Sequence, residues 1–197
     1  MCKPWLVTPS KTAESKTAES KTAESNPAEP ESAEPRIADR IDPTTLPGRP
    51  CSVAAALEVV GDRWSLLVVR EVMFGNHRFS EIAHGTGAPR DRLAARLKVL
   101  VESGVLERRQ YQASPARWDY HLTARGRSLS AVLQALRQWG DHWAVDEPPL
   151  TLRHRDHAFE GEWTCKSCGE PVRSADIHRH CTVAGWEVDY VDAIAQG

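Results

Sequence analysis

Two cysteines near the C-terminus have the spacing of a metal-binding knuckle. Cys165 and Cys168 are separated by two residues, and Gly169 follows directly. Two thiolates at this spacing bend around one Zn²⁺ ion, and the glycine relieves the tight turn that this requires. A tetrahedral site takes two further ligands. One candidate pair lies downstream, His178 with Cys181, and the other lies upstream, His154 with His157. The sequence favours the downstream pair because it adds a third sulfur.

The predicted zinc is structural, and the sequence indicates no other cofactor. No base-bearing motif such as H-E-x-x-H accompanies the cysteines. The chain also offers no nucleophile–base pairing, no phosphate-binding loop and no paired carboxylates in a credible setting, so we expect that it is not an enzyme.

Five cysteines are an odd, sparse set, which argues against a secreted disulfide framework. No apolar run approaches the ~18–20 residues of a membrane span, and the N-terminus lacks a signal pattern. We therefore expect a cytoplasmic protein with no membrane partner.

A second set of chemically active side chains lies on residues 89–103, which have the pattern of an amphipathic helix. Pro89 suits its first turn, and Leu93, Leu97 and Leu100 recur on one side. The other side combines long basic side chains with a small residue, which would let the helix approach a polyanion closely. In the major groove of double-stranded DNA, Arg92, Arg96 and Lys98 would face the bases and Ala95 would lie closest. The predicted contacts of this helix are Arg90, Arg92, Ala95, Arg96 and Lys98.

The charge of the chain is informative only when it is divided. Residues 48–145 carry 14 Lys/Arg and 9 Asp/Glu, a net charge of +5. Residues 1–47 carry 6 and 8, a net charge of −2, and residues 146–197 carry 5 and 10, a net charge of −5. A basic middle segment between acidic flanks favours an anionic partner for the middle segment.

The elements around the basic helix form a helix-turn-helix pattern followed by a wing. Apolar spacing predicts short helices over residues 53–60, 64–72 and 79–83, and a tight turn over 85–89 leads into the basic helix. Residues 105–122 read as a hairpin of two strands, with Trp118, Tyr120 and Leu122 facing inward. Three arginines on this wing are predicted to contact phosphate or the minor groove: Arg108, Arg109 and Arg117.

Thr123 is predicted to cap a long helix that runs to about Val145. Its apolar stripe is too rich for a helix that lies half in solvent. We expect part of the stripe to pack on the core and part against a second subunit, since a dimer presents two recognition helices about one DNA turn apart. The stripe consists of Leu129, Val132, Leu133, Leu136, Trp139 and Trp143.

Five blocks of sequence, in the right order, resemble the HxlR-type winged-helix regulators over about residues 51–146. The resemblance implies a homodimeric bacterial transcription regulator that binds an inverted-repeat operator through the basic helix and the wing. The dimer that it implies is built from the first and last helices. The blocks are Cys51-Ser-Val-Ala-Ala-Ala-Leu-Glu-Val-Val-Gly-Asp-Arg-Trp64, Arg78-Phe-Ser-Glu-Ile82, Leu93-Ala-Ala-Arg-Leu97, Leu100-Val-Glu-Ser-Gly-Val-Leu-Glu-Arg108 and Tyr120-His-Leu-Thr-Ala-Arg-Gly126.

The resemblance also makes Cys51 a candidate redox sensor. Family members that sense thiol-reactive or carbonyl stress do so through a cysteine at this position, while packing as a small apolar side chain is the alternative. The chain departs from the family at Ala88-Pro89-Arg90-Asp91, which replaces a Ser/Thr-rich helix start. The operator sequences of the family therefore do not transfer to this chain.

Together these observations predict a mainly α protein with a small β-hairpin wing, of the α+β winged helix-turn-helix class, in three parts. Residues 1–48 form a disordered low-complexity tail, with Lys-Thr-Ala-Glu-Ser three times in tandem over residues 11–25. Residues 49–146 form the DNA-binding and dimerisation domain, and residues 147–197 form an acidic extension with the zinc knuckle. The alternative function is a zinc-dependent protein-interaction adaptor that keeps this scaffold and reads no DNA sequence.

Overall fold

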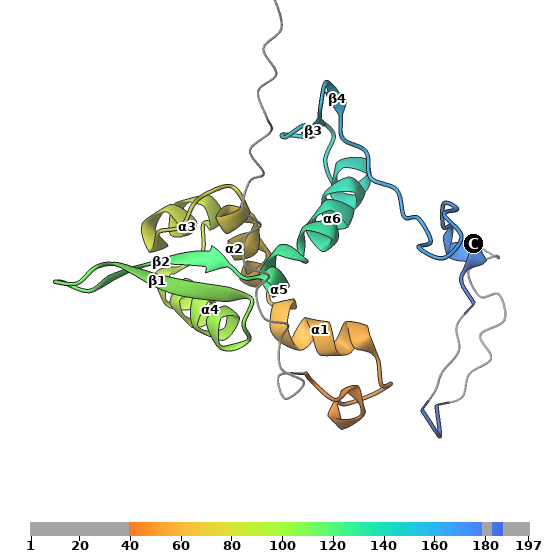
Figure 1. Ribbon diagram of the computed structural model, residues 1–197, viewed down its shortest axis with the longest axis horizontal. Coiled ribbons are helices and arrows are strands. Elements are labelled where there is room, and N and C mark those ends of the chain that lie inside the picture. Colours follow the sequence, from red (N-terminus) through yellow and green to blue (C-terminus); the bar gives the residue numbers. More distant parts are fainter. Residues whose placement is uncertain (1–39, 179–182, 187–197) are drawn as a thin grey trace, which may run out of the picture. The chain divides into compact units, whose positions relative to one another are not determined.

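The computed structural model describes residues 40–178 and 183–186, and it places helices and a wing in the predicted order (Figure 1). The predicted fold class is confirmed. The elements in chain order are the 3-10 helix η2 (Pro43–Thr45), α1 (Ser52–Val60), α2 (Arg63–Met73), α3 (Phe79–Thr86), α4 (Arg90–Glu102), β1 (Leu106–Gln112), β2 (Arg117–Leu122), α5 (Ala124–Arg127), α6 (Ser130–Trp143), β3 (Arg153–His154), β4 (His157–Ala158) and the 3-10 helix η3 (Ser174–Asp176).

Side chains that accept backbone hydrogen bonds fix where α2 and α5 begin. Asp62 precedes α2, and its Oδ1 accepts the N–H of Trp64 at 2.9 Å. Thr123 precedes α5, and its Oγ1 accepts the N–H of Gly126 at 3.1 Å. The same hydroxyl donates to the Gly104 carbonyl at 2.6 Å. One side chain therefore caps α5 and ties it to the start of the wing.

An apolar core joins α2, α3, α4 and the base of the wing. α4 contributes Leu93, Leu97 and Leu100, each at most 1% exposed, because residues three and four apart share one face of a helix. Full burial of such a side chain contributes roughly 1.5–3 kcal/mol. This stripe therefore decides which face of α4 turns away from the protein. The other largest buried side chains are Ser65, Val68, Val69, Ile82, Val105 and Leu106.

β1 and β2 form an antiparallel hairpin that packs beside α4 and makes the wing (Figure 1). Leu106 pairs with Leu122 at its base. Tyr120 and Leu122 are half-buried against the core, as predicted. The inward position predicted for Trp118 is wrong, because this residue lies two positions further from the base than Tyr120 and is 37% exposed.

The long helix predicted after Thr123 is interrupted between α5 and α6. The N–H of Leu129 donates to the Gly126 carbonyl at 3.1 Å, which closes a tighter turn before α6 begins. The physical reason lies in the approach of α5 to the wing, since a Cβ on Gly126 would lie 2.2 Å from the Val105 carbonyl oxygen. α5 is thus held at the base of the wing, and α6 is a separate helix.

α6 carries an apolar stripe that the described part of the chain leaves largely uncovered. Only its beginning, at Leu129 and Leu133, packs against the core among the described residues. From there the stripe continues with large side chains that are between 43% and 71% exposed. α1 adds two more side chains that are over half exposed. The exposed stripe of α6 is Val132, Leu136, Trp139 and Trp143, and the exposed residues of α1 are Val53 and Leu57.

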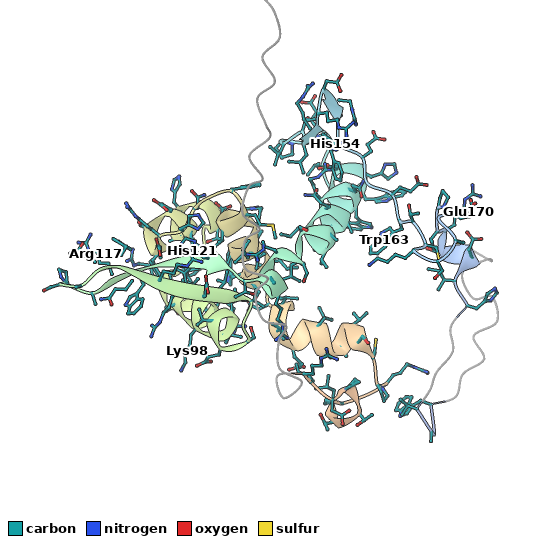
Figure 2. The ribbon with its side chains drawn as sticks, in the orientation of Figure 1. Lys98, Arg117, His121, His154, Trp163 and Glu170 are labelled. Carbon is teal, nitrogen blue, oxygen red and sulfur yellow. The ribbon has the colours of Figure 1, made fainter. Side chains whose placement is uncertain are left out.

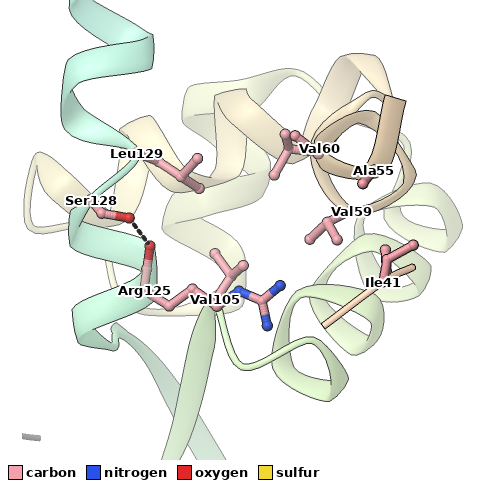
Figure 3. Close-up of a pocket in the computed structure, with 9 residues that line it drawn as sticks. Ile41, Ala55, Val59, Val60, Val105, Arg125, Ser128 and Leu129 are labelled. Atoms are coloured by element: carbon pink, nitrogen blue, oxygen red, sulfur yellow. Dashed lines mark hydrogen bonds between the residues drawn. The ribbon is translucent and has the colours of Figure 1, made fainter. Parts of the chain in front are cut away.

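A pocket of about 250 Å³ opens where α1 and α5 approach the start of β1 (Figure 3). Its walls are mostly apolar. Arg125 brings a guanidinium to it and donates to the Ser103 carbonyl at 2.7 Å, while the Ser128 hydroxyl donates to the Arg125 carbonyl at 2.8 Å. The pocket therefore marks the junction between α1 and the winged-helix core. It is lined by Ile41, Ala55, Ala56, Val59, Val60, Val105, Arg125, Ser128 and Leu129.

The segment just before α1 has local structure within the stretch that the sequence assigns to the tail. Residues 40–48 are among the described residues and contain η2, for which Asp42 is the N-cap. The Asp42 Oδ1 accepts the N–H of Thr44 at 2.9 Å, and Ile41 lines the pocket beside α1. A local cap and an apolar contact thus hold a stretch that the composition around it assigns to a tail.

The extension beyond α6 is built differently. Among the described residues from 146 to 178, none is buried. β3 and β4 pair as a short hairpin, and a bridge joins Thr164 to Pro171 on either side of the two cysteines. No helix in the part of the chain that the structure describes is long and apolar enough to cross a membrane.

Candidate nucleic-acid interface

The turn between α3 and α4 sets how the basic helix begins. Gly87 ends α3 at φ +66°, in the left-handed region that favours glycine. The Thr86 hydroxyl donates to the Ile82 carbonyl at 2.7 Å and accepts the N–H of Ala88 at 3.2 Å. Although the sequence pattern places Pro89 in the first turn of α4, it stands just before the first residue of this helix. Its missing N–H still costs nothing there.

The face of α4 opposite the core is cationic and open. Arg92 and Lys98 keep 73% and 75% of their side-chain surface. Their nearest carboxylates, on Asp91 and Glu102, lie 3.9 and 3.7 Å away, and exposed pairs of this kind hold side chains weakly. The basic side chains can therefore reach a polyanion. The exposed predicted contacts on this face are Arg90, Arg92, Ala95 and Lys98.

Arg96 is placed differently from the other basic residues of α4. Its side chain is 29% exposed, and its Nε lies 3.9 Å from the Oδ1 of Asp62, which caps α2. Because residue 96 directly precedes the buried Leu97, it stands at the edge of α4 that faces α2. Arg96 therefore links the two helices, in addition to any contact that it makes with DNA.

The wing carries three exposed arginines. The Nε of Arg109 donates to the Oε1 of Glu107 at 2.9 Å. The guanidinium of Arg108 lies 4.6 Å from the centroid of the Trp118 ring, a cation–π geometry. Arg117 lies near the tip of the hairpin (Figure 2). Both α4 and the wing thus present cationic side chains to solvent.

Known proteins resemble this chain in the part that forms the interface. The family model described as HxlR-like helix-turn-helix matches residues 59–148. An uncharacterised HTH-type transcriptional regulator of Mycobacterium tuberculosis is 42% identical over 131 residues, which cover 64% of this chain and 82% of the relative. The chain belongs to the HxlR-like helix-turn-helix family.

Two solved structures and a further relative agree with this assignment. The crystal structure of PA1607, assigned as a transcription factor, has a TM-score of 0.59 and 36% identity, covering 66% of this chain and 93% of that chain. PA1374 from Pseudomonas aeruginosa has a TM-score of 0.51 and 30% identity, covering 68% and 94%. The HTH-type transcriptional regulator YodB of Bacillus subtilis is 33% identical over 50% of this chain and 87% of its own length. The HxlR-like chain is therefore a transcription regulator and not an enzyme.

A buried polar corner, which the sequence interpretation missed, positions the helix-turn-helix of this HxlR-like chain. Glu71 in α2 is 4% exposed, and its carboxylate accepts hydrogen bonds from Arg70 and Asn76, both at 2.7 Å. Arg70 also donates to the Gly85 carbonyl at 3.0 Å. A buried carboxylate needs such partners because its desolvation is costly. The sequence signal that could have revealed this corner is the adjacent charged pair Arg70 and Glu71 within the apolar residues of α2.

Two histidines that the sequence treats as ordinary residues join the wing to the loop between α2 and α3. The N–H of Tyr120 donates to the His77 carbonyl at 2.9 Å, and the His77 Nδ1 lies 2.9 Å from the Tyr120 carbonyl. The His77 ring stacks on the His121 ring at 4.4 Å between centroids. The His121 Nε2 lies 3.1 Å from the Oδ1 of Asp119. These contacts set the position of the wing beside α3.

Cys51, the candidate redox sensor, stands at the N-terminus of α1 and is half-exposed. Its Sγ accepts the N–H of Val53 at 3.3 Å. The backbone N–H groups of Ala54 and Val53 lower the pKa of the Cys51 thiol below its ordinary value, because they stabilise the thiolate. These N–H groups therefore favour the thiolate of Cys51, which is the nucleophilic form. The cysteine lies just before α1, the helix whose apolar side chains are exposed.

The predicted knuckle lies in a tight turn. Gly169 has a φ of +80°, and its N–H donates to the Cys165 carbonyl at 2.8 Å. The N–H groups of Cys168 and Ser167 lower the pKa of the Cys165 thiol, since both donate to its sulfur. Cys168 is exposed and Cys165 is half-exposed. The turn is the one that the C-x-x-C-G pattern predicts.

The structure does not bring the other predicted ligands to this turn. His154 and His157 pair across β3 and β4, with ring centroids 5.4 Å apart. His178 is exposed, and Cys181 lies outside the described residues. Among the described residues, no three His, Cys, Asp or Glu side chains come close enough together to hold a metal ion.

Proposed function

We propose that this HxlR-like regulator binds an inverted-repeat operator as a homodimer, with α4 in the major groove and the wing on the DNA backbone or in the minor groove. The observation that carries the proposal is the exposed cationic face of α4 beside a wing with three further exposed arginines. In the major groove an Arg fork on guanine is worth roughly 1–3 kcal/mol of discrimination. Phosphate contacts from the wing position the helix but carry no sequence information.

The exposure of the side chains supports a division of roles. Arg92 and Lys98, with most of their surface in solvent, suit contacts to base edges, and Ala95 lets the backbone approach the groove. Arg96 combines its link to Asp62 with a contact at the edge of α4. The proposed contacts of α4 are Arg90, Arg92, Ala95, Arg96 and Lys98, and those of the wing are Arg108, Arg109 and Arg117.

The homodimer is supported by the uncovered stripe of α6 and the exposed residues of α1. Large apolar side chains contribute roughly 1.5–3 kcal/mol each when buried, so leaving Trp139 and Trp143 at 62% and 71% exposure forgoes a substantial stabilisation. An isologous interface between two copies would cover the stripe of α6 and the exposed residues of α1 on both copies at once. It also provides two copies of α4 for two half-sites.

DNA binding is tested by fluorescence anisotropy with labelled DNA from upstream of the regulator's own gene and with a scrambled duplex. We expect operator binding that weakens steeply with salt, because several phosphates are neutralised. Arg92→Ala should weaken binding to the operator more than to the scrambled duplex. Arg117→Ala should weaken both about equally and reduce the salt slope by about 1. Arg155→Ala, in the extension, is the control and should change neither.

Two outcomes would contradict the proposal. If no duplex binds at moderate salt, the chain is not a DNA reader. If Arg92→Ala weakens both duplexes equally, α4 contacts phosphate and does not read bases.

Arg96 has a test of its own, because the structure gives it two partners. We expect Arg96→Ala to weaken operator binding selectively. Asp62→Asn removes the charge opposite Arg96 without touching the DNA-facing surface, and it serves as the matched variant. If Asp62→Asn reproduces the whole loss, the contribution of Arg96 comes from holding α4 against α2 and not from reading bases.

We also propose that Cys51 makes DNA binding responsive to electrophiles. The thiolate favoured by the N–H groups of Ala54 and Val53 adds to an electron-poor carbon–carbon double bond. A sulfur–carbon bond forms, the π bond breaks, and the neighbouring carbon takes a proton from water. Because Cys51 begins α1, the added group lies next to Val53, which belongs to the exposed apolar surface of the proposed dimer. Modification would therefore alter the dimer and, through it, operator binding.

A further inference from the structure

The C-terminal extension has local structure without a core to explain it. Between residues 146 and 178, none of the described residues is buried, although this stretch contains two short strands, a bridge and a 3-10 helix. Segments this small need a disulfide, a metal or a partner when they cannot bury enough apolar surface. The segment around residues 159–161 is tied to α6, because Arg137 donates to the Phe159 carbonyl at 3.4 Å and Gln138 donates to the Gly161 carbonyl at 3.0 Å. The turn at the two cysteines is held by hydrogen bonds of its own, which is the setting of a local metal link.

The turn around the two cysteines is the best-organised part of the extension. The Cys165 N–H donates to the Glu170 carbonyl at 2.9 Å, and the Gly169 N–H donates back to the Cys165 carbonyl at 2.8 Å. The Val172 N–H donates to the Trp163 carbonyl at 2.8 Å, so both ends of the turn are tied. Two sulfurs are thereby held within one short loop.

We propose that Cys165 and Cys168 bind one structural Zn²⁺ ion that folds the C-terminal extension. Zinc takes two thiolates at this spacing in a tetrahedral site. None of the three cysteines among the described residues is in a disulfide, so both thiols of the turn are available to a metal ion. This site is separate from the DNA interface, since the segment from residue 146 is acidic.

The two remaining ligands come from the same extension. The preceding hairpin offers His154 and His157, whose Cα atoms are directly paired and whose rings lie 5.4 Å apart. The following segment offers His178, which is exposed, together with Cys181 in the sequence. Among the described residues, none of His154, His157 and His178 forms a group of three ligands with the cysteines. Small zinc modules bring their ligands together only when the metal binds, and we expect the same of this extension.

The first test measures zinc in the full-length protein, purified without chelators and without a metal-affinity step. We expect about one Zn²⁺ per chain by elemental mass spectrometry, lost in both Cys165→Ser and Cys168→Ser. Cys51→Ser is the matched control, since it removes a thiol outside the site and should keep the metal. Wild-type protein that contains no zinc and binds none on addition would overturn the proposal. So would zinc that survives Cys165→Ser.

The second test replaces the zinc with Co²⁺, whose thiolate charge-transfer band grows with the number of bound sulfurs. If Cys181→Ser lowers this band and His154→Ala with His157→Ala leaves it unchanged, the downstream pair completes the site. If instead Cys181→Ser leaves the spectrum unchanged and His154→Ala with His157→Ala abolishes metal binding, the upstream pair completes the site. If neither substitution changes the cobalt spectrum or the zinc content, the extension lacks a shell of its own and the proposal fails.

A third readout is independent of metal content. Chelation of the wild-type protein should open residues 146–178 to limited proteolysis, while residues 51–143 stay resistant and DNA binding persists. Unchanged cleavage after complete metal removal would contradict a role for zinc in folding the extension. Failure of DNA binding would concern the proposed function and not this site.

Discussion

α4 and α6 carry apolar stripes of the same kind, and among the described residues only the stripe of α4 is covered. In α4 the three leucines of the stripe are at most 1% exposed, whereas in α6 the four residues from Val132 to Trp143 are 43% to 71% exposed. Both patterns have the helical spacing that marks a buried face. The difference lies in the partner. α4 meets α2 and β1 of its own chain, and α6 offers its stripe to something else.

The contrast assigns the two helices to different tasks. The apolar face of α4 packs against the core, so its opposite face is exposed to solvent. The charged side chains on that exposed face are mostly basic. α6 keeps its apolar face outward, and this is the face that the proposed homodimer would bury. In a winged-helix regulator the two tasks are linked, since the spacing between two copies of α4 is set by whatever joins the copies.

The largest expected effect separates the two stripes with the same substitution. Leu97→Ala should destabilise the protein by about 2–5 kcal/mol, because it opens a cavity in a packed core. Leu136→Ala is the matched change in α6, where half of the side chain is exposed. Urea unfolding at several protein concentrations measures both.

The concentration dependence decides between the explanations. The loss caused by Leu97→Ala should be the same at every concentration, whereas the loss caused by Leu136→Ala should appear only where the dimer is populated. A concentration-independent loss of similar size in both variants would show that the stripe of α6 is covered within one chain.

The second prediction breaks the proposed interface itself. Trp139→Glu combined with Trp143→Glu should weaken self-association at least 30-fold, since central aromatic residues of an interface contribute about 2 kcal/mol or more each. Light scattering on a sizing column should then show monomers with unchanged helix content. Trp163→Glu is the control, because Trp163 is 68% exposed in the extension. A double variant that remains dimeric would place the interface elsewhere.

The third prediction concerns the buried polar corner around Glu71, which positions the helix-turn-helix. Gly85→Ala should cost roughly 1–3 kcal/mol, since the new Cβ would lie 2.0 Å from the Glu71 Oε2 and would disturb a buried hydrogen-bonded carboxylate. Operator affinity should fall with it, because Arg70 holds the Gly85 carbonyl just before the turn into α4. His84→Ala is the control, because His84 is an exposed neighbour on α3. Equal stability of the two variants would show that the corner gives way without cost.

The sequence predicts the elements well because their signals are local. The leucine spacing of α4, the Asp62 and Thr123 caps and the C-x-x-C-G turn each depend on residues close together in the chain. Three features depend on distant ones. The break before α6 follows from the contact between Gly126 and Val105, the position of Arg96 follows from Asp62, and the His77–His121 stack joins residues 44 positions apart.

The smallest expected effect tests α1, the other half of the proposed association surface. The backbone N–H groups at the start of α1 lower the pKa of the Cys51 thiol, so its alkylation rate by iodoacetamide should reach half its plateau at a pH below that of a free cysteine. Below that pH the thiolate is protonated and the rate falls. A Cys51→Ser variant identifies the contribution of this thiol, because the signals of the remaining cysteines are left.

Modification of Cys51 should also act on association. A bulky maleimide on Cys51 places new volume beside Val53 and Leu57, which are 65% and 57% exposed in a single chain. If α1 belongs to the interface with α6, the modified protein should dissociate at higher concentration than the unmodified protein and lose operator affinity in parallel. Cys51→Ser should resist the reagent in both measurements. If alkylation is fast but leaves association and DNA binding unchanged, α1 lies outside the interface, and the stripe of α6 must find its partner without it.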